Sequence, residues 1–415
     1  MRLRGAALVS LALALGAPAG AAAHGNNGFV EHVRVLHAWH GAPGGYFGWA
    51  VSELRDIDGD HATDLIIGEP NTPDGGTTYV YSGRSGRLIY RLPGVVNDFQ
   101  GGAIADAGDT DADGVHDIVS GAPGTGAAGG PGRAYLYSGR TGKLLHTWEG
   151  GPPSDQLGYA VASAGDQDGD GHSDVLVGAI GVNGGAGAAY VYSGRTYQLL
   201  RRIDGDAGDG FGSATDWTRS LDRDRRPDLI VGAFTEPGAH VFSSLGGELF
   251  ALAPPPAQGA FANFFVAGVG RVDGDRIPDL YAGDYAAGDG AGYAGVYSGR
   301  DGSVIHQWFG GPGDGTGPGR EAGDSNHDGR VDLAVGSYTA SDAVAGGGRV
   351  DVHSGRTGRV LRTITSTTPG ENLGFDTVGL GDVNRDGEPD LLVSAATGST
   401  VYLIDGVKPR RRGAG

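Results

Sequence analysis

The sequence has no cysteine among its 415 residues, which excludes disulfide bonds, thiolate nucleophiles, cysteine-bound zinc and iron–sulfur clusters. Helical periodicity is absent over any useful length, and no segment after the N-terminus is long and apolar enough to cross a bilayer. Basic residues are also few, since 31 Lys and Arg stand against 49 Asp and Glu, giving a net charge of −18. This balance opposes binding to phosphate backbones. We therefore expect no nucleic-acid partner and no transmembrane segment.

The first 23 residues have the features of a secretory signal peptide. Arg2 and Arg4 precede an apolar stretch from Ala6 to about Leu15, and small residues follow as far as Ala23. A membrane anchor would need about 20 apolar residues, and glycine and proline interrupt this stretch too soon. We expect a Sec-type signal peptide over residues 1–23, cleavage after Ala23, and a secreted, extracellular protein.

Glycine is abundant, at 82 residues, but its periodic recurrence indicates a repeat and not disorder. One unit recurs seven times, and its clearest part is a nine-residue acidic loop that runs into a short apolar strand. The ninth position of this loop is Asp in every copy, at intervals of 51 to 58 residues: Asp64, Asp117, Asp174, Asp228, Asp279, Asp332 and Asp390.

Each unit is predicted to form four short β-strands. An FG start such as Phe47-Gly48 opens the unit, and the apolar run after the ninth Asp suits a buried strand. A glycine-rich connection leads to a third strand, and a Gly-Arg-Xaa-Gly turn flanked by alternating polarity is typical of a hairpin. Four strands in each of seven units predict an all-β fold, the seven-bladed β-propeller.

The two ends of the repeat array predict a closed ring. The seventh unit stops after its third strand, at residues 400–404, whereas residues 33–41 match the fourth strand that begins at Leu144. An N-terminal strand is therefore expected to complete the last blade. We assign residues 24–408 to the propeller and 409–415 to a basic C-terminal tail.

The acidic loops carry Asp at positions 1, 3, 5 and 9, which places four carboxylates around one point. Oxygen ligands in that number favour Ca²⁺ over zinc or copper. The alternative is that they are solvated turn aspartates, but recurrence at a fixed phase argues against it. The first three loops have the full set, and the sixth and seventh have Asn at position 3. The predicted metal ligands are Asp56, Asp58, Asp60, Asp64, Asp109, Asp111, Asp113, Asp117, Asp166, Asp168, Asp170, Asp174, Asp324, Asn326, Asp328, Asp332, Asp382, Asn384, Asp386 and Asp390.

The fourth and fifth loops depart from this pattern. Arg271 holds position 1 of the fifth loop, and we expect its guanidinium to lie among the three remaining aspartates of that loop as a built-in cation. Ser220 holds position 1 of the fourth loop, which Arg223, Arg225 and Arg226 are expected to crowd. We therefore predict about five Ca²⁺ ions, which would stabilise the fold in the place of disulfides.

The FG starts, the DxDxDGxxD loops and GAP ends such as Gly121-Ala122-Pro123 resemble the FG-GAP repeats of the integrin α-subunit propeller. The resemblance covers essentially the whole chain after residue 23. It implies calcium in the loops of one face, ligand binding on the opposite rim, and a role in adhesion or extracellular recognition. Two departures are units five and six, which lack the FG pair and have Ala262-Asn263 and Gly315-Thr316 there.

An enzymatic role has no motif to support it. The sequence lacks HExxH, GxSxG and P-loop motifs. His37, His146 and His306 recur at one place in the fourth strands, which indicates a structural role. We predict a non-catalytic protein. The alternatives are a propeller-based extracellular hydrolase or polysaccharide lyase and, because the turns resemble quinoprotein repeats, a quinone-dependent dehydrogenase.

The ligand of the predicted module is an extracellular protein or glycan, and the sequence does not identify it. The loops between blades offer candidate contacts, and we expect a monomer. These candidates are Tyr46, Phe99, Asp155, Gln156, Asp209 and Glu371.

Overall fold

The computed structural model of the 415-residue chain describes residues 28–124, 131–152, 154–235, 238–244, 246–253 and 265–406. The predicted signal peptide and the basic tail lie outside the described residues. Within these residues, every helix is too short or too polar to traverse a lipid bilayer.

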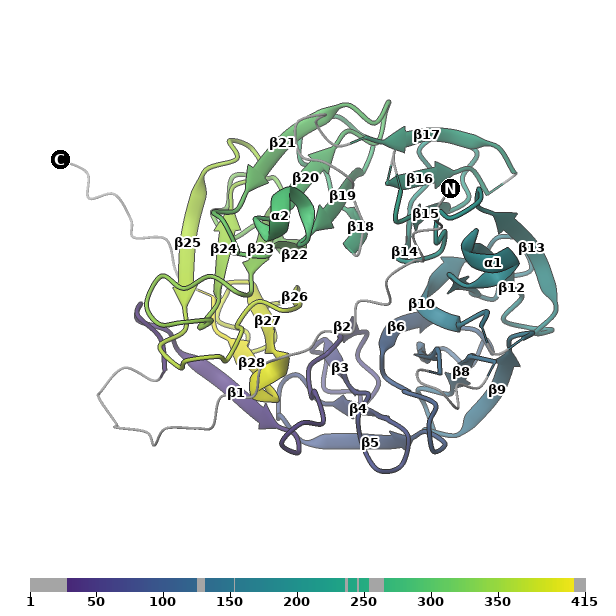
Figure 1. The fold of residues 1–415 in the computed structure, drawn as a ribbon, viewed down its shortest axis with the longest axis horizontal. Coiled ribbons are helices and arrows are strands. Elements are labelled where there is room, and N and C mark those ends of the chain that lie inside the picture. The colour runs from purple at the N-terminus through teal and green to yellow at the C-terminus, as the bar shows by residue number, and fades with distance from the viewer. Residues whose placement is uncertain are drawn as a thin grey trace, which may run out of the picture.

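The fold is a ring of seven four-stranded antiparallel sheets, which confirms the predicted seven-bladed β-propeller (Figure 1). The first strand of each blade lies innermost and the fourth lies on the perimeter. Blades one to three are β2 (Val51–Leu54), β3 (Asp64–Glu69), β4 (Thr77–Tyr81) and β5 (Leu88–Pro93); β6 (Ala103–Gly108), β7 (Asp117–Ala122), β8 (Arg133–Tyr137) and β9 (Leu144–Glu149); and β10 (Leu157–Gly165), β11 (Asp174–Ala179), β12 (Ala188–Tyr192) and β13 (Leu199–Asp204).

The other four blades repeat this order. They are β14 (Thr215–Thr218), β15 (Asp228–Gly232), β16 (Ala239–Phe242) and β17 (Glu248–Leu252); β18 (Phe265–Val269), β19 (Asp279–Asp284), β20 (Tyr293–Tyr297) and β21 (Val304–Phe309); β22 (Thr316–Gly323), β23 (Asp332–Ser337), β24 (Arg349–His353) and β25 (Val360–Thr365); and β26 (Thr377–Gly381), β27 (Asp390–Ala395) and β28 (Thr400–Ile404) with β1 (Val35–His40). Short helical turns follow three second strands: α1 (Val182–Gly185), α2 (Ala287–Gly290) and η2 (Ala396–Gly398).

The N-terminal strand closes the ring, as the sequence predicted. β1 pairs antiparallel with β28, so that Trp39 lies opposite Val401 and His40 opposite Thr400. The indole Nε1 of Trp39 then donates a hydrogen bond of 2.9 Å to the carbonyl of Gly86, in the outer turn of blade one. The first and last blades are therefore joined both by a strand ladder and by side-chain contacts.

The second strands are apolar throughout because both of their faces are covered. Leu65, Ile66 and Ile67 of β3 are all fully buried. Ile66 packs in one cluster with Ile118 of blade two, whereas Leu65 and Ile67 pack in another with Leu392 of blade seven. Because side chains alternate along a strand, each second strand contributes to the core on both sides of its blade.

The recurring His and Trp of the fourth strands join neighbouring blades. Trp148 and Trp308 donate to carbonyl groups in the outer turns of the next blades, each at 3.0 Å. His37 and His306 form hydrogen bonds to carbonyl groups of the same turns, and His146 stacks on Tyr197 at a centroid distance of 4.4 Å. These contacts give the recurring histidines a structural role.

Adjacent blades touch through paired glycines. A Cβ on Gly121, at the end of β7, would lie 2.1 Å from the carbonyl oxygen of Gly158, the FG-type glycine of the next blade. Gly158 itself has φ +84°, and a Cβ there would lie 2.0 Å from the carbonyl oxygen of Arg133. The same close approach recurs at four further junctions between blades: Gly68 with Gly101, Gly178 with Gly212, Gly283 with Gly317, and Gly336 with Gly374.

This pairing corrects the sequence alignment of unit six. Gly317 occupies the FG-type glycine position, and the bridge between Gly292 and Thr316 matches the bridge between Gly187 and Phe211 in unit four. Thr316-Gly317 therefore replaces the FG pair, so that assigning Gly315-Thr316 to it was wrong by one residue. The corresponding Ala262-Asn263 of unit five lies outside the described residues.

Replacing Trp39 with Ala should destabilise the closed ring by about 3 to 5 kcal/mol, because a large buried side chain leaves a cavity. Trp39 is 8% exposed and also packs on Tyr81 at a centroid distance of 5.3 Å. Trp217→Ala is the matched control, since Trp217 is 36% exposed, and should cost under about 1 kcal/mol. Chemical denaturation measures both, and equal losses would contradict a closing role for Trp39.

Candidate metal centres

All seven acidic loops lie on one face of the ring. Each loop joins the first strand of a blade to the second, as the loop between β2 and β3 does with residues 55–63. Because all first strands run in the same direction through the ring, the turns that precede them lie on the opposite face. The loops and the FG-type turns therefore form two separate surfaces.

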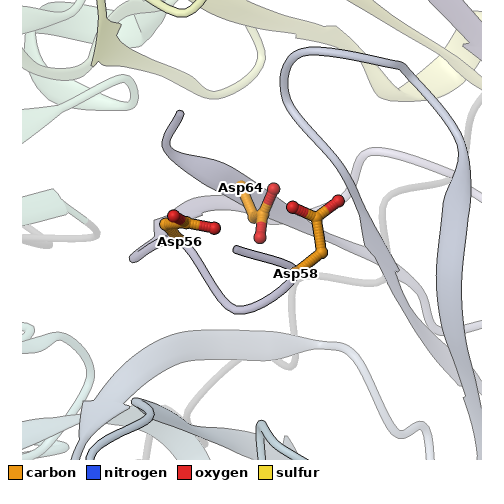
Figure 2. Close-up of side chains that lie close together, drawn as sticks. All are labelled: Asp56, Asp58 and Asp64. Carbon is orange, nitrogen blue, oxygen red and sulfur yellow. The ribbon is translucent and has the colours of Figure 1, made fainter. Parts of the chain in front are cut away.

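Four of the loops bring three carboxylates together. Among the described residues, Asp56, Asp58 and Asp64 each offer an oxygen within 4.8 Å of the others (Figure 2). The second and third loops repeat this arrangement from positions 1, 3 and 9, whereas the fourth uses positions 3, 5 and 9. These clusters are Asp109, Asp111 and Asp117; Asp166, Asp168 and Asp174; and Asp222, Asp224 and Asp228.

The position-1 carboxylate shapes the loop around the cluster. In loop one, Oδ1 of Asp56 accepts a hydrogen bond of 2.7 Å from the Gly59 amide, and Oδ2 accepts one of 2.7 Å from the His61 amide. In loop two, Asp109 accepts from the amides of Asp113 and Gly114 at 3.0 Å each. The backbone thus curls around the carboxylate, as Asx turns do.

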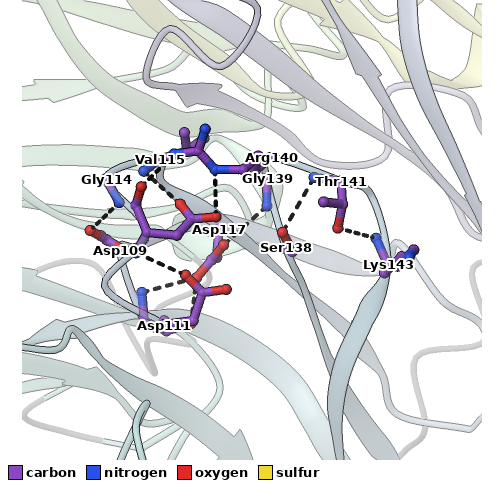
Figure 3. Close-up of polar contacts among 12 residues, drawn as sticks. Asp109, Asp111, Gly114, Val115, Asp117, Ser138, Gly139, Arg140, Thr141 and Lys143 are labelled. Carbon is purple, nitrogen blue, oxygen red and sulfur yellow. Dashed lines mark hydrogen bonds and ion pairs between the residues drawn. The ribbon is translucent and has the colours of Figure 1, made fainter.

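The position-9 carboxylate joins the acidic loop to the outer turn of its own blade. Asp117 accepts the Thr110 amide at 2.9 Å on one oxygen and the Gly139 amide at 3.0 Å on the other (Figure 3). All seven position-9 aspartates are fully buried and bind the equivalent pair of amides. The other pairs are Ile57 and Gly83, Gln167 and Gly194, Leu221 and Ser244, Val272 and Gly299, Ser325 and Gly355, and Val383 and Gly406.

Burial makes these aspartates weak acids. It raises the pKa of Asp64 to about 7 and that of Asp117 to about 6, and the two amide hydrogen bonds only partly offset it. Burial likewise raises the pKa of Asp279, and it raises the pKa of the remaining four to about 6: Asp174, Asp228, Asp332 and Asp390. A carboxylate held in this way favours either a proton or a nearby cation.

The sixth and seventh loops offer amide oxygens. Oδ1 of Asn326 is buried and has no hydrogen-bond partner among the described residues. A buried acceptor without a donor is costly, and a bound cation would satisfy it. In loop seven, the amide of Asn384 donates to Asp405. The donor sets of both loops consist of oxygen atoms only, which fits Ca²⁺.

The structure places two of the loop arginines, Arg271 and Arg226, differently from the sequence expectation. Arg271 is exposed and forms no ion pair with a described residue, whereas Arg300 of the outer turn lies 2.6 Å from Asp275. The expectation for Arg271 was therefore wrong, since its exposed side chain keeps its hydration. Arg226 donates to the Gln167 carbonyl of the neighbouring blade, away from its own cluster.

The opposite face carries half-buried aromatic side chains that sequence reasoning largely missed. Trp49 contacts Phe99 and Phe375 at centroid distances of 6.2 and 5.1 Å. Phe375 continues to Tyr338 at 5.3 Å, and Tyr338 to Tyr285 at 5.5 Å. These five rings, from blades two, one, seven, six and five, form a continuous row that we call the aromatic arc. Tyr46 packs on Trp49 at 5.7 Å, and Tyr159 and Phe234 form a separate pair at 6.2 Å.

A pattern in the repeat marks these residues. Trp49, Tyr159 and Phe375 each follow the FG-type glycine, and Tyr285 and Tyr338 each follow the second strand. Of the candidate contacts predicted from the sequence, Tyr46 and Phe99 lie beside or in the arc. Glu371 does not fit a contact role, because it is 6% exposed and accepts hydrogen bonds from Ser366 and Tyr402.

The raised pKa values predict that the chelated protein loses stability as pH rises. The folded state binds more protons than the unfolded state between the unfolded pKa of 3.8 and the folded values of about 6 to 7. The stability from these groups is thus present below the unfolded pKa and is lost as pH rises through the folded pKa. Burial also raises the pKa of Glu53, Asp216 and Glu321, which act in the same sense, whereas His146 and His353, whose pKa burial lowers, act in the opposite sense.

Thermal unfolding in a chelator should therefore show a melting temperature several degrees lower at pH 8 than at pH 5. Asp117→Asn removes one of the titrating groups and should flatten this dependence. A melting temperature that is constant or rises over this range would contradict the prediction.

Comparisons with known proteins place the chain near integrin α subunits. No protein-family model matches the chain. Integrin alpha-V of Gallus gallus is 35% identical over 158 residues, covering 33% of this chain and 15% of that protein. Integrin alpha-5 of Xenopus laevis is 30% identical over 214 residues, covering 46% of this chain and 20% of that protein. Integrin alpha-PS5 of Drosophila melanogaster is 30% identical over 191 residues, covering 41% and 18%. These alignments thus span a fifth or less of each relative.

Solved structures agree on the fold alone. BBS1N, in a complex with ARL6DN soaked with lead, has a TM-score of 0.58 at 11% identity, covering 93% of this chain and 98% of that one. Raptor of Chaetomium thermophilum has a TM-score of 0.56 at 12% identity, covering 88% and 29%. The sequence similarity and the seven blades together support the resemblance of this chain to the FG-GAP propeller of integrin α subunits.

Proposed function

We propose that this chain is a secreted, calcium-stabilised and non-catalytic module that recognises an extracellular protein. The observation that carries this proposal is the separation of two surfaces on one ring. Clustered carboxylates occupy one face, and a row of half-buried aromatic rings occupies the other. The similarity to integrin α subunits supports recognition as the role, and the predicted signal peptide supports secretion.

Calcium would bind in the acidic loops through the chain's own oxygen atoms. The carboxylates at positions 1, 3 and 9 already lie within 4.8 Å of one another in loops one to three. Asn326 and Asn384 supply neutral oxygens in loops six and seven, where one negative charge is therefore absent. When bound, calcium would neutralise like charges that burial brings together. About five sites are expected, and loop four is a further candidate because three of its carboxylates converge.

Calcium should raise the melting temperature strongly. If each site has a dissociation constant of ~0.1 mM, then ~1 mM calcium stabilises the fold by about 1.4 kcal/mol per site. Five sites would then contribute an amount comparable to the whole stability of a typical domain. We expect a rise of at least about 10 °C over the chelated protein and about five bound ions after dialysis.

Asp111→Asn provides the internal control for this measurement. Asp111 is exposed and belongs to the cluster of loop two, so the variant should lose one ion and leave the chelated protein within about 0.5 kcal/mol of the wild type. An unchanged melting temperature with calcium, and no bound ion, would reject the calcium sites.

The aromatic arc is the proposed contact surface. Aromatic side chains give large contact areas at low conformational cost, and they are enriched in the cores of protein interfaces. The arc is also rigid, because each ring rests on the next and the turns that carry the rings are fixed by the glycine pairs between blades. A preorganised surface reduces the entropy lost on binding.

Screening the calcium-loaded protein against extracellular matrix proteins and glycans tests this role. We expect a protein ligand whose binding falls at least tenfold in Trp49→Ala and Phe375→Ala, since truncating a central aromatic residue of an interface often costs about 2 kcal/mol or more. Leu144→Ala, on the perimeter strand β9 and 53% exposed, is the control and should bind normally. A ligand that binds both arc variants as tightly as the wild type would place recognition elsewhere.

A further inference from the structure

Five blades carry a Ser-Gly-Arg turn between their third and fourth strands. The glycine amide of each turn donates to the position-9 Asp, so the arginine that follows lies beside the acidic loop of the same blade. Recurrence of arginine at this place needs a reason, because a hairpin turn does not require it. The five arginines are Arg84, Arg140, Arg195, Arg300 and Arg356.

The guanidinium groups contact the position-5 residue of the loop. Arg140 shows this contact most fully: its Nε lies 2.8 Å from Oδ2 of Asp113, and its Nη2 donates to the Asp113 carbonyl. Figure 3 shows Arg140 reaching from the turn over the acidic loop. The remaining nitrogen-to-carboxylate distances are 4.0 Å for Arg195 and Asp170, 2.6 Å for Arg300 and Asp275, and 3.3 Å for Arg356 and Asp328.

Blade one is the exception. Arg84 donates to the backbone carbonyl of Asp60 at 2.8 Å and not to its carboxylate. The Ser82 hydroxyl donates to the Asp60 carboxylate at 3.2 Å. Loops one and two carry the same four aspartates, yet only in loop two does a guanidinium pair with the position-5 carboxylate. The chain therefore contains two chemically matched loops that differ in this contact.

One oxygen of the position-5 carboxylate, Oδ1, already accepts a hydrogen bond from the backbone. In all seven loops, Oδ1 accepts the backbone amide of position 7, which leaves Oδ2 as the oxygen that a metal or an arginine can take. In loops one to three, the position-5 carboxylate lies outside the cluster of three. In loop four, Ser244 takes the place of the turn glycine, since its amide donates to the position-9 Asp228. Its hydroxyl donates to Oδ2 of Asp224, and Asp224 belongs to the cluster.

We propose that the turn arginine is a resident cation that holds the position-5 carboxylate and lowers the affinity of its loop for calcium. The inference rests on the calcium binding proposed above. A guanidinium in contact with a ligand carboxylate withholds an oxygen, and its positive charge also repels a divalent ion nearby. The same contact relieves the repulsion among the carboxylates before calcium arrives. The turn arginine is therefore a positioning residue that makes the calcium affinity differ from loop to loop. Loop two, whose position-5 carboxylate pairs with Arg140, should bind calcium more weakly than loop one.

The test compares full-length wild type with Arg140→Gln and Lys143→Gln. Lys143 lies in the same turn, and its replacement removes the same charge, but its side chain contacts no described acidic residue. Two quantities are measured with Ca²⁺ as the probe: bound ions against free calcium by equilibrium dialysis, and the melting temperature in a chelator. In Arg140→Gln, one site should fill at about tenfold lower free calcium, while the chelated protein melts at a lower temperature. Lys143→Gln should change neither quantity.

A merely structural arginine would give another result. If the arginine only orients Asp113, its loss should weaken calcium binding as well as stability, and this outcome overturns the proposal. Unchanged calcium binding, or an equal gain in Lys143→Gln, also overturns it. Arg356→Gln makes the same test in blade six and serves if Arg140→Gln does not fold. If the wild type binds about five ions and the arginine variants bind calcium as the wild type does, this inference alone is rejected. If the wild type binds no calcium, the proposed calcium sites and this inference are rejected together.

Discussion

The close backbone contact between neighbouring blades is the constraint on which the remaining structure depends. At five junctions, a glycine near the end of a second strand lies against the FG-type glycine of the next blade, and a Cβ on the second-strand glycine would fall about 2 Å from the carbonyl oxygen of its partner. This contact explains why both the FG start and the GAP end of the repeat require glycine. Between blades seven and one, Ser394 takes the place of the second-strand glycine and lies beside Gly48. The recurring tryptophans and histidines add contacts farther out, between the perimeter strands and the turns of the next blades.

Within each blade, the position-9 aspartate does for the chain what a disulfide does in many secreted proteins. It joins the acidic loop to the outer turn by two amide hydrogen bonds, and it does so in all seven blades. Its invariance therefore has a structural cause that needs no metal. The carboxylates at positions 1 and 3 are more exposed, and in loops one to three they converge with position 9, so binding a cation would be a second role for the position-9 aspartate. The two roles explain why the loops keep Asp at position 9 even in units where Arg or Ser holds position 1.

The sequence was sufficient to predict the fold, because a period of about 54 residues, the phase of the acidic loops and the fourth-strand match at residues 33–41 all indicate a closed ring. It was also sufficient to predict that position-9 residues lie beside positions 1 and 3. It could not predict the aromatic arc, since rings such as Trp49 and Phe375 meet only after the first and last blades come together. Arg271 was misplaced for a similar reason: the charge that pairs with Asp275 comes from Arg300, 25 residues away and on a different pair of strands.

Closure by β1 has a consequence for folding kinetics. His40 contacts Thr400 across a sequence separation of 360 residues, so the strand that precedes the seven repeats pairs with the last strand of the ring. Contacts of such long range form slowly, and blade seven keeps an open edge until they do. Every intermediate with fewer blades therefore exposes both an unpaired N-terminal strand and an unfinished sheet edge. An array that lacks β1 would be prone to pair with another copy of itself, so closure of the ring by β1 covers the edge at which such pairing would begin.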